Sequence, residues 1–453
     1  MGRRDPHLRG QGRLSYLDQL ARFASHARLA DLSEKALART RWLVADTLPV
    51  VAAGMQQPEM QRLIRGRRGE GVSWIIGSGK RSGALDAALL NGTAGTFLEL
   101  NEGNLYAKGH PGIQVVPAAV ALAQETGASG EALLGAVAVG YDVCSRISRA
   151  AQVRIEVHPH GTWGVIGAAV AAARLKGFDE RRMRELINVA STMGMATSRQ
   201  TLLDGATVRN IFTGHAGYMG LMAVRLVECG FTGEKDSVAA VYGKVLSDGL
   251  DPEKVVEGLG REWMIELGYF KLHPTGRYVH SAIDALEDAL KTPFAAADVE
   301  RIDVEAYRLC AMLKEKRVTS SFGARFSVPF ALAAILHHGR SSLAAFEEVG
   351  NEAVQQLASR IEVRENPAYT QRYPAEQCCD VRVTLREGRV LEGRCVVTKG
   401  EPSRPHSAEE LEAKFMQLGA PLWGDAQAKR LLAGCLALEE VSDFARFAQD
   451  FDL

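Results

Sequence analysis

Several features that would place a protein in a familiar class are missing from this sequence. No apolar run approaches the ~18 residues that a membrane-spanning helix needs. The first residues, MGRRDPHLRGQGR, are polar and basic without an apolar core, so we do not expect a secretory signal. We interpret residues 1–14 as a flexible arm, with a transit peptide as the alternative. The expectation is a cytoplasmic protein without a membrane partner.

Cysteine spacing and charge balance exclude further classes. The seven cysteines are odd in number and never form a CxxC pair, which argues against a disulfide framework, a zinc site or an iron–sulfur site. We interpret them as thiols in a reducing compartment. The 54 basic residues balance the 54 acidic ones, so no net field attracts nucleic acid or a membrane surface.

The common catalytic motifs are also absent. We find no GxxxxGK[ST], no GxGxxG after a strand, no GxSxG and no HExxH. This disfavours an NTPase, a Rossmann dehydrogenase, an α/β-hydrolase and a zincin. The composition of the chain, 46% hydrophobic and 24% charged, is that of a soluble globular protein. Its length of 453 residues allows two or three domains.

The first part of the chain has a helical pattern. Over residues 15–270 apolar side chains recur at spacings of three and four, and strand-like alternation is scarce. We expect Ser33 and Ser129 to be N-caps, and Gly54 to end the helix that Ser33 begins. Another helix should carry Pro117 in its first turn and close at Gly127.

The pattern changes after residue 270. VERIDVEAYRL and DVRVTLREGRVLEGRCVV alternate with period two, and Glu387-Gly388 suits a hairpin turn between two strands. Helical segments lie between these strands, which predicts a smaller α+β domain over 271–404. Helical sequence then returns over 405–453. The predicted fold is therefore mainly α: a large all-helical domain, 15–270 completed by 405–453, plus a smaller α+β domain.

Four polar clusters interrupt the helical sequence at loop-to-helix junctions. They contain Glu99, Asn101, Glu102, Lys108 and His110; His158, His160, Thr162 and Trp163; Arg199, Asp204, Arg209, Asn210 and His215; and Lys271, His273, Arg277, Tyr278 and His280. Any one cluster alone is better explained as a hydrogen-bonded turn or a helix end. Four clusters of one chemical type shift the balance toward a shared site.

Cations and imidazoles in these clusters indicate the kind of ligand. Free N–H groups at helix starts, such as the turn at 158–164, favour an anion. Joined to Arg209, Lys271 and Arg277, they would suit a small polycarboxylate. His110 and His158 could supply an acid or a base near neutral pH.

At these clusters the sequence resembles the MmgE/PrpD family, which includes 2-methylcitrate dehydratase, cis-aconitate decarboxylase and an iminodisuccinate epimerase. Five blocks in the right order carry the resemblance, which extends from about Tyr16 to the C-terminal helices: ELNEGNLYAKGHPGIQVVPAAVALAQETGASGEALLGAVAVGYDV, HPHGTWGVIGAAVAAARLKGFDE, DGATVRNIFTGHAGYMGLMAVRLVECGFTG, KLHPTGRYVHSAIDAL and ARFSVPFALA. It implies a helical domain covered by a smaller lid domain, with the pocket between them. It also implies a homodimer without a metal or an organic cofactor.

From the clusters and the resemblance we predict two sets of site residues. The catalytic set is His110, His158, Lys271 and Glu102. The substrate-binding set is Glu99, Asn101, Lys108, Arg209, Arg277 and His280.

Four positions depart from the family pattern. Asn101 cannot ionise, and Gly103 lacks the hydroxyl that relatives carry there. Arg209 stands in place of a lysine, and Gly276 stands where relatives place a Cys or His.

The leading hypothesis is a cofactor-independent lyase of the dehydratase type, acting on a small hydroxylated di- or tricarboxylate. Lys271 or a histidine would remove a proton α to a carboxylate, and His110 or Glu102 would protonate the departing hydroxyl. A decarboxylase or an epimerase of a related polycarboxylate is the alternative. A non-catalytic carboxylate-binding protein is the alternative from another class.

Overall fold

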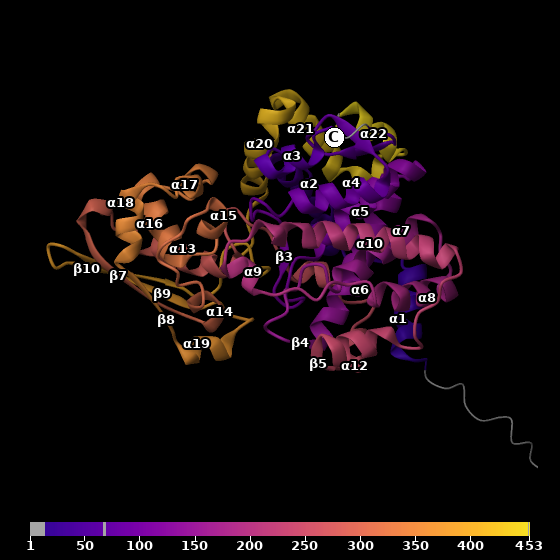
Figure 1. The fold of residues 1–453 in the computed structure, drawn as a ribbon, viewed down its shortest axis with the longest axis horizontal. Helices are drawn as coiled ribbons and strands as arrows, with labels where there is room; N and C mark the ends of the chain where they lie inside the picture. The colour runs from indigo at the N-terminus through magenta and orange to yellow at the C-terminus, as the bar shows by residue number, and fades with distance from the viewer. Residues whose placement is uncertain (1–13, 67–68, 452) are drawn as a thin grey trace, which may run out of the picture.

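The computed structural model describes residues 14–66, 69–451 and 453, so the predicted arm lies, apart from Leu14, outside the described residues. The chain is mainly α-helical, with a smaller α+β portion on the left in Figure 1, as the sequence predicts. We call α1–α12 with α20–α22 the large part, and α13–α19 with β7–β10 the small part.

The large part is built almost entirely from helices. They are α1 (Tyr16–His26), α2 (Glu34–Met55), α3 (Pro58–Ile64), α4 (Ala84–Ala94), α5 (Pro111–Thr126), α6 (Gly130–Ala150), α7 (Gly164–Leu175), α8 (Glu180–Ser191), α9 (Gln200–Leu203), α10 (Ile211–Glu228), α11 (Ser237–Ala240), α12 (Pro252–Val256), α20 (Ala408–Trp423), α21 (Asp425–Leu436) and α22 (Phe444–Asp450). Short antiparallel pairs tie loops together: β1 (Ser73–Ile75) with β2 (Lys80–Ser82), β3 (Gly103–Asn104) with β6 (Gly268–Tyr269), and β4 (Ala151–Val153) with β5 (Ser247–Leu250).

Glycines let the central helices of the large part pack closely. A Cβ on Gly140 of α6 would lie 2.5 Å from the carbonyl oxygen of Gly167 in α7. A Cβ on Gly214 of α10 would lie 2.1 Å from the carbonyl oxygen of Leu89 in α4. Real side chains cannot occupy such space, so these crossings require glycine. As a result α5, α7 and α10 all pack against one another.

The predicted helix ends are partly correct. Ser33 and Ser129 accept hydrogen bonds from the backbone N–H groups three residues later, at 2.9 and 3.1 Å, and are N-caps as expected. Gly127 ends α5 with a φ of 61°.

Two of the predicted ends are wrong. α2 continues one residue past Gly54, to Met55. The glycine lets α2 pack closely against α4, because a Cβ at this position would lie 2.0 Å from the carbonyl oxygen of Ala94. Pro117 lies inside α5, whose first residue is Pro111. Tertiary packing explains the position of Gly54, and local sequence preferences do not reveal it. The proline of the first turn of α5 is Pro111, a local signal that Pro117 obscured.

The small part is a four-stranded sheet with helices on one face (Figure 1). Its elements are α13 (His280–Ala289), β7 (Val299–Ala306), α14 (Arg308–Ala311), α15 (Ser321–Ala324), α16 (Val328–His338), α17 (Leu343–Glu347), α18 (Glu352–Ser359), β8 (Ile361–Glu365), α19 (Pro367–Arg372), β9 (Cys379–Leu385) and β10 (Val390–Cys395). The strand order is β10-β9-β7-β8, with only β7 and β8 parallel among the described strands. Burial alternates along β9, as period two requires.

Two separate clusters of buried apolar side chains underlie the two parts. One runs from Leu17 to Ile265 and is completed by side chains from Phe415 to Leu453. The other is formed by side chains from Val279 to Cys395, with Leu202 added from the large part. The C-terminal helices return to the start of the chain, where α20 and α21 pack on α2 (Figure 1). Within the described residues no helix combines the length and apolarity that crossing a bilayer requires.

Candidate active site

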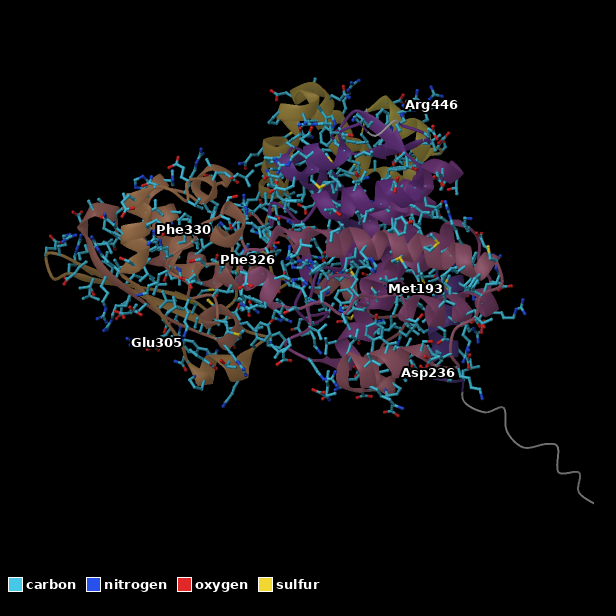
Figure 2. All side chains as sticks on the ribbon, viewed as in Figure 1. Met193, Asp236, Glu305, Phe326, Phe330 and Arg446 are labelled. Atoms are coloured by element: carbon cyan, nitrogen blue, oxygen red, sulfur yellow. The ribbon has the colours of Figure 1, made fainter. Side chains whose placement is uncertain are left out.

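Three mutually packed helices bring the polar clusters together. His110 lies immediately before α5, the loop with His158 and His160 leads into α7, and Arg209 lies two residues before α10. Because α5, α7 and α10 contact one another, their N-terminal approaches meet in one place. The small part closes this place from the other side. Phe326 lies at this junction between the two parts (Figure 2).

A small buried cavity lies at this junction. Its volume of about 50 Å³ has room for only a few water molecules. It is lined by Glu99, Asn104, Leu105, Lys108, Gly109, His110, His158, Pro159, His160, Arg199, Leu202, Arg209, Tyr269, Gly276, Arg277, Tyr278, Phe326 and Tyr373. Six of the ten predicted site residues line it: Glu99, Lys108, His110, His158, Arg209 and Arg277.

Glu99 joins three distant segments of the chain. Its carboxylate accepts a hydrogen bond from Arg209 at 2.5 Å and another from Lys271 at 3.1 Å. All three side chains are buried. Burial would raise the pKa of Glu99, but Arg209 and Lys271 overcome it and lower the pKa to about 2. Glu99 also has a φ of 54°, a strained backbone conformation of the kind that occurs at functional sites.

Lys271 is fully buried and lies behind Glu99, outside the cavity lining. Burial lowers its pKa to about 8, against the opposing effect of the Glu99 carboxylate. The lysine is therefore poised to lose its proton at a moderately alkaline pH.

His110 has its tautomer fixed by the backbone. Its Nδ1 lies 2.7 Å from the carbonyl oxygen of Glu102, which can only accept, so Nδ1 carries the proton and Nε2 carries the lone pair. Burial and the nearby Lys271 lower the pKa of His110 to about 3. The ring is thus neutral, with a free acceptor nitrogen.

His158 faces hydrogen-bond donors on both sides. The N–H of His160 lies 3.1 Å from its Nδ1, and Nε of Arg209 lies 3.3 Å from its Nε2. Burial and Arg209 lower the pKa of His158 well below its ordinary value. His158 therefore stays neutral beside Arg209.

The backbone N–H groups of the turn at 158–164 are less available than the sequence suggests. Those of His160, Gly161 and Thr162 donate to His158, Gln114 and Pro159 respectively. Gln114 also donates to the carbonyl oxygen of His110 at 3.0 Å, so it ties the His110 and His160 segments together. An anion in the cavity would depend mainly on side-chain cations.

Arg277 lines the cavity but is occupied by protein partners. It donates to Glu401 at 2.7 Å and to the carbonyl oxygen of Lys399 at 3.0 Å, and its guanidinium lies over the Tyr269 ring at 4.3 Å. His280, also predicted to bind substrate, lies behind Arg277 at 3.1 Å and outside the lining. This pair mainly fixes the junction between the two parts.

The remaining predicted residues vary in position. Glu102 lies outside the lining, where its carboxylate accepts from Tyr141 at 2.5 Å and from the N–H of Gly112 at 3.0 Å. Burial raises the pKa of Glu102 to about 7. Asn101 is buried beside it and does not reach the cavity. Lys108 lines the cavity but donates to the carbonyl oxygen of Ala151 at 2.5 Å.

Sequence reasoning missed the aromatic wall of the cavity. Tyr269, Phe326 and Tyr373 line it, and none was assigned a role. Tyr269 lies at the start of the fourth polar cluster, and Phe326 lies in the block ARFSVPFALA. Tyr373 and Phe326 lie more than 100 residues beyond Arg209, so no local spacing connects them to the site. His160 and Tyr278 stand in the clusters but were not assigned a role.

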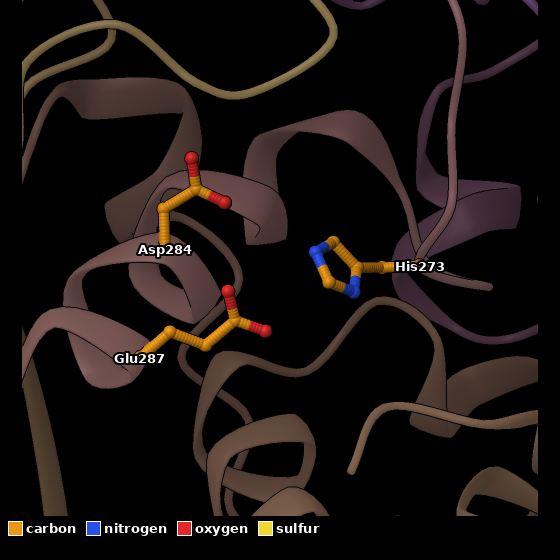
Figure 3. A group of neighbouring side chains, drawn as sticks. All are labelled: His273, Asp284 and Glu287. Atoms are coloured by element: carbon orange, nitrogen blue, oxygen red, sulfur yellow. The ribbon is translucent and has the colours of Figure 1, made fainter. Parts of the chain in front are cut away.

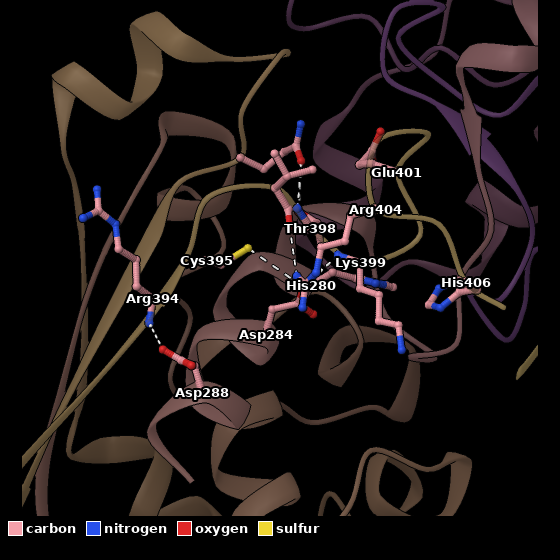
Figure 4. Close-up of polar contacts among 12 residues, drawn as sticks. His280, Asp284, Asp288, Arg394, Cys395, Thr398, Lys399, Glu401, Arg404 and His406 are labelled. Carbon is pink, nitrogen blue, oxygen red and sulfur yellow. Dashed lines mark hydrogen bonds and ion pairs between the residues drawn. The ribbon is translucent and has the colours of Figure 1, made fainter. Parts of the chain in front are cut away.

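One group among the described residues has the composition of a metal site. His273, Asp284 and Glu287 point toward one another (Figure 3) and place their donor atoms within 4.8 Å. The Asp284 carboxylate, however, already accepts from Arg404 at 2.6 Å and from the backbone N–H of Lys399 at 2.7 Å (Figure 4). The adjacent guanidinium offsets the negative charge that a divalent cation would need, so we assign no metal here.

The fold and the site define a class: a mainly helical protein with a cation- and imidazole-lined cavity where an α+β part closes over a helical part. Comparison with known families agrees. The MmgE/PrpD N-terminal domain matches residues 18–254, and the MmgE/PrpD C-terminal domain matches residues 273–438. The chain belongs to the MmgE/PrpD family.

Individual relatives are distant but match over most of their length. A cis-aconitate decarboxylase of Aspergillus terreus is 22% identical, covering 94% of this chain and 94% of that protein. The cis-aconitate decarboxylase-like protein oryM of Aspergillus oryzae is 23% identical, covering 94% and 95%. The human cis-aconitate decarboxylase is 24% identical, covering 79% and 77%.

Proposed function

We propose that this protein is a lyase that acts on a small di- or tricarboxylate by removing a proton α to a carboxylate group. The observation that carries this proposal is the convergence of Glu99, His110, His158 and Arg209 on one buried cavity, with Lys271 joined to it through Glu99. In this cluster two cations, Arg209 and Lys271, share the one Glu99 carboxylate, and the excess of positive charge favours an anionic ligand.

Arg209 is the residue that we propose binds a substrate carboxylate. Its Nη1 holds Glu99, and its Nε faces His158, whereas Nη2 makes no hydrogen bond to any described residue. An N–H group without a partner among the described residues, beside a buried ion pair, is well placed to take a second carboxylate. The fixed positive charge of Arg209 and Lys271 would also stabilise the enediolate that forms when the α proton leaves.

His110 is the base that we propose, in preference to Lys271. Its free Nε2 belongs to a residue of the cavity lining, whereas Lys271 lies behind Glu99. The pKa of about 3 for His110 reflects burial beside cations. A bound polycarboxylate adds negative charge, and this raises the pKa of a neighbouring imidazole and makes it a better base.

The small part is proposed to act as a lid domain, with boundaries at 271 and 404. A polycarboxylate is larger than a few water molecules, so it cannot enter a cavity of about 50 Å³ unless the two parts separate. Reclosure would exclude water from the charged intermediate. From the family resemblance we further propose a cytoplasmic homodimer that needs no metal or organic cofactor.

Two reactions are candidates at this cavity. Removal of the α proton followed by loss of hydroxide from a hydroxy acid, a dehydration, is the first proposal. Decarboxylation is the second, because the relatives that match most of the chain carry the name cis-aconitate decarboxylase. It needs no α-proton removal: the bond to one carboxylate breaks as carbon dioxide leaves, and the carbanion that remains takes up a proton from the site. An epimerase would need a base on each face of the carbon.

The test is turnover of chelator-treated protein on a panel of hydroxy acids and unsaturated acids, followed by NMR. Dehydration forms an alkene that absorbs in the ultraviolet, decarboxylation releases carbon dioxide, and epimerisation does neither. We expect His110→Gln and Arg209→Met to lower kcat/KM by at least about 100-fold. The control His26→Gln, on the exposed face of α1, should match the wild type. Stabilisation by polyacids without any turnover would instead support a carboxylate-binding protein.

A further inference from the structure

We infer that His160 contacts the substrate and recognises a hydroxyl group of a hydroxylated polycarboxylate. This inference rests on the proposed function and adds to it the feature that separates a hydroxy acid from its deoxy analogue. The observation that motivates it is a buried imidazole in the cavity lining whose two ring nitrogens have no hydrogen-bond partner among the described residues.

His160 is almost completely buried, with 1% of its surface exposed. Its ring lies edge-to-face between those of His110 and His158, at centroid distances of 4.9 and 4.6 Å. In an edge-to-face contact, the face of one ring can partly satisfy the N–H donor of the other. The second ring nitrogen of His160 still has no hydrogen bond. Buried polar groups without partners are uncommon in native proteins, and they mark places where a ligand supplies the missing bond.

A loosely held loop does not explain the missing bonds. The backbone N–H of His160 donates to His158, and the next N–H, that of Gly161, donates to Gln114 at 2.9 Å. The carbonyl oxygen of Gly161 accepts from Met195 at 2.7 Å. Gly161 has a φ of 79°, which glycine adopts without strain. The loop is therefore fixed on three sides, with the unpartnered ring held in the cavity wall.

The chemistry of the ring selects the group that it binds. Burial, together with the charge of Arg209, keeps His160 neutral, since its pKa lies well below the ordinary value. A neutral imidazole offers one donor and one acceptor, and a hydroxyl group can satisfy either. Carboxylates only accept, and Arg209 is the better partner for them. The division of roles is therefore carboxylate to Arg209 and hydroxyl to His160.

Matched ligand pairs test this inference. Citrate and tricarballylate differ by one hydroxyl, as do malate and succinate. We expect wild-type protein to bind the hydroxy acid of at least one pair about tenfold more tightly than its deoxy analogue in calorimetry. His160→Phe keeps the ring shape without nitrogens, so it should lose this preference while affinity for the deoxy acid stays the same. It should also fold at least as stably as wild type, because it removes two unpartnered nitrogens.

The control is His406→Phe. His406 also has two buried nitrogens without hydrogen bonds, but it lies outside the cavity lining, so its replacement should keep the preference. If His160→Phe does not fold, His160→Leu takes its place. A hydroxyl preference that survives in the His160 variant overturns the inference, as does wild-type protein without any preference.

The two proposals can fail separately. Turnover of a hydroxy acid with an unchanged preference in His160→Phe would remove the inference and leave the lyase standing. A preference that depends on His160 without turnover of any acid in the panel would support the inference and remove the lyase.

Discussion

At the scale of single residues, Glu99 shows how the site can hold charge away from water. An isolated carboxylate in this position would take up a proton, because burial raises its pKa. Two cations from segments 110 and 172 residues away keep it ionised instead. Its strained backbone is held by these same contacts. The charge state of one residue thus depends on three parts of the chain.

The pH dependence of activity should reveal the role of Lys271. If it acts as a cation, it is effective only while protonated, so kcat/KM should fall as the pH rises above about 8, its pKa. Replacing Glu99 by Gln removes the charge that raises this pKa, so the fall should move to lower pH by about one unit. The measurement is a kcat/KM profile for each variant.

The control for this profile is Glu392→Gln, in an exposed pair with Arg382, which should leave it unchanged. An activity that instead rises through pH 8 would contradict the cationic role and identify Lys271 as the base.

Glu102 should make stability depend on pH in the opposite sense to an ordinary carboxylate. Its pKa is about 7 in the folded protein and 4.5 for the ordinary group, so between these values the folded state holds a proton that the unfolded chain has lost. Stability should therefore fall as the pH rises from 4.5 to 7, by about 3 kcal/mol from this group. Glu102→Gln should remove that loss, seen as a urea midpoint that decreases less than that of the wild type. Equal pH dependence in both proteins would argue against the raised pKa.

At the scale of secondary structure, the residues of the candidate site lie just before the N-terminal ends of helices. α5, α7 and α10 pack together because glycines allow their neighbours to approach, and each begins just after a site residue or loop. α20 adds support from the far end of the chain. Its Lys414 donates to Asp46 of α2 at 2.5 Å and to the carbonyl oxygen of Leu100, next to Glu99, at 2.7 Å.

Replacing Lys414 by Met should destabilise the protein by about 3–5 kcal/mol, because it leaves the buried Asp46 carboxylate without a countercharge. Adding Asp46→Asn to the same protein should recover part of this loss. Urea unfolding of the single and double variants measures both effects. The exposed Lys429 of α21 provides the control, since Lys429→Met should change stability by less than about 0.5 kcal/mol. Equal losses in the single and double variants would show that the ion pair is not the cause.

At the scale of the whole molecule, two hydrophobic cores meet at a junction that contains the cavity. The large part reaches into the small one through Leu202 of α9, which belongs to both the cavity lining and the second core. A Cβ on Gly205 would lie 2.8 Å from Cα of Gly323, so the two parts touch closely here. In the proposed opening of the two parts, this contact would loosen.

Hydrogen exchange should locate that movement. With saturating citrate, amide exchange should slow in α9, whose Leu202 lines the cavity, and in α15, which ends two residues before the lining residue Phe326. Exchange in the central strand β7 should stay the same, because it lies inside one part. Protection spread evenly over the chain in the presence of bound ligand would contradict an opening at this junction.

Much of the secondary structure could be predicted from the sequence, because strand alternation and helix caps depend on residues that are close together in the chain. Period-two alternation gave β7, β9 and β10, and serine caps gave the starts of α2 and α6. The expected position of Gly54 was wrong for a non-local reason, because this glycine allows α2 to cross α4 closely. The expected position of Pro117 was wrong for a local one, because the proline in the first turn of α5 is Pro111, six residues earlier.

The sequence by itself determined the helical and α+β character, the polar clusters and the family to which they belong. Only the tertiary structure decided which cluster residues face one another: it put His110, His158 and Arg209 on the cavity and set Lys271 and Glu102 behind it. It also added Tyr269 and Phe326 to the lining and left the two ring nitrogens of His160 without a hydrogen-bond partner among the described residues. The physical reason is that side-chain chemistry is encoded at each position, whereas its neighbours, burial and charge state arise from contacts between segments that lie from 39 to 172 residues apart.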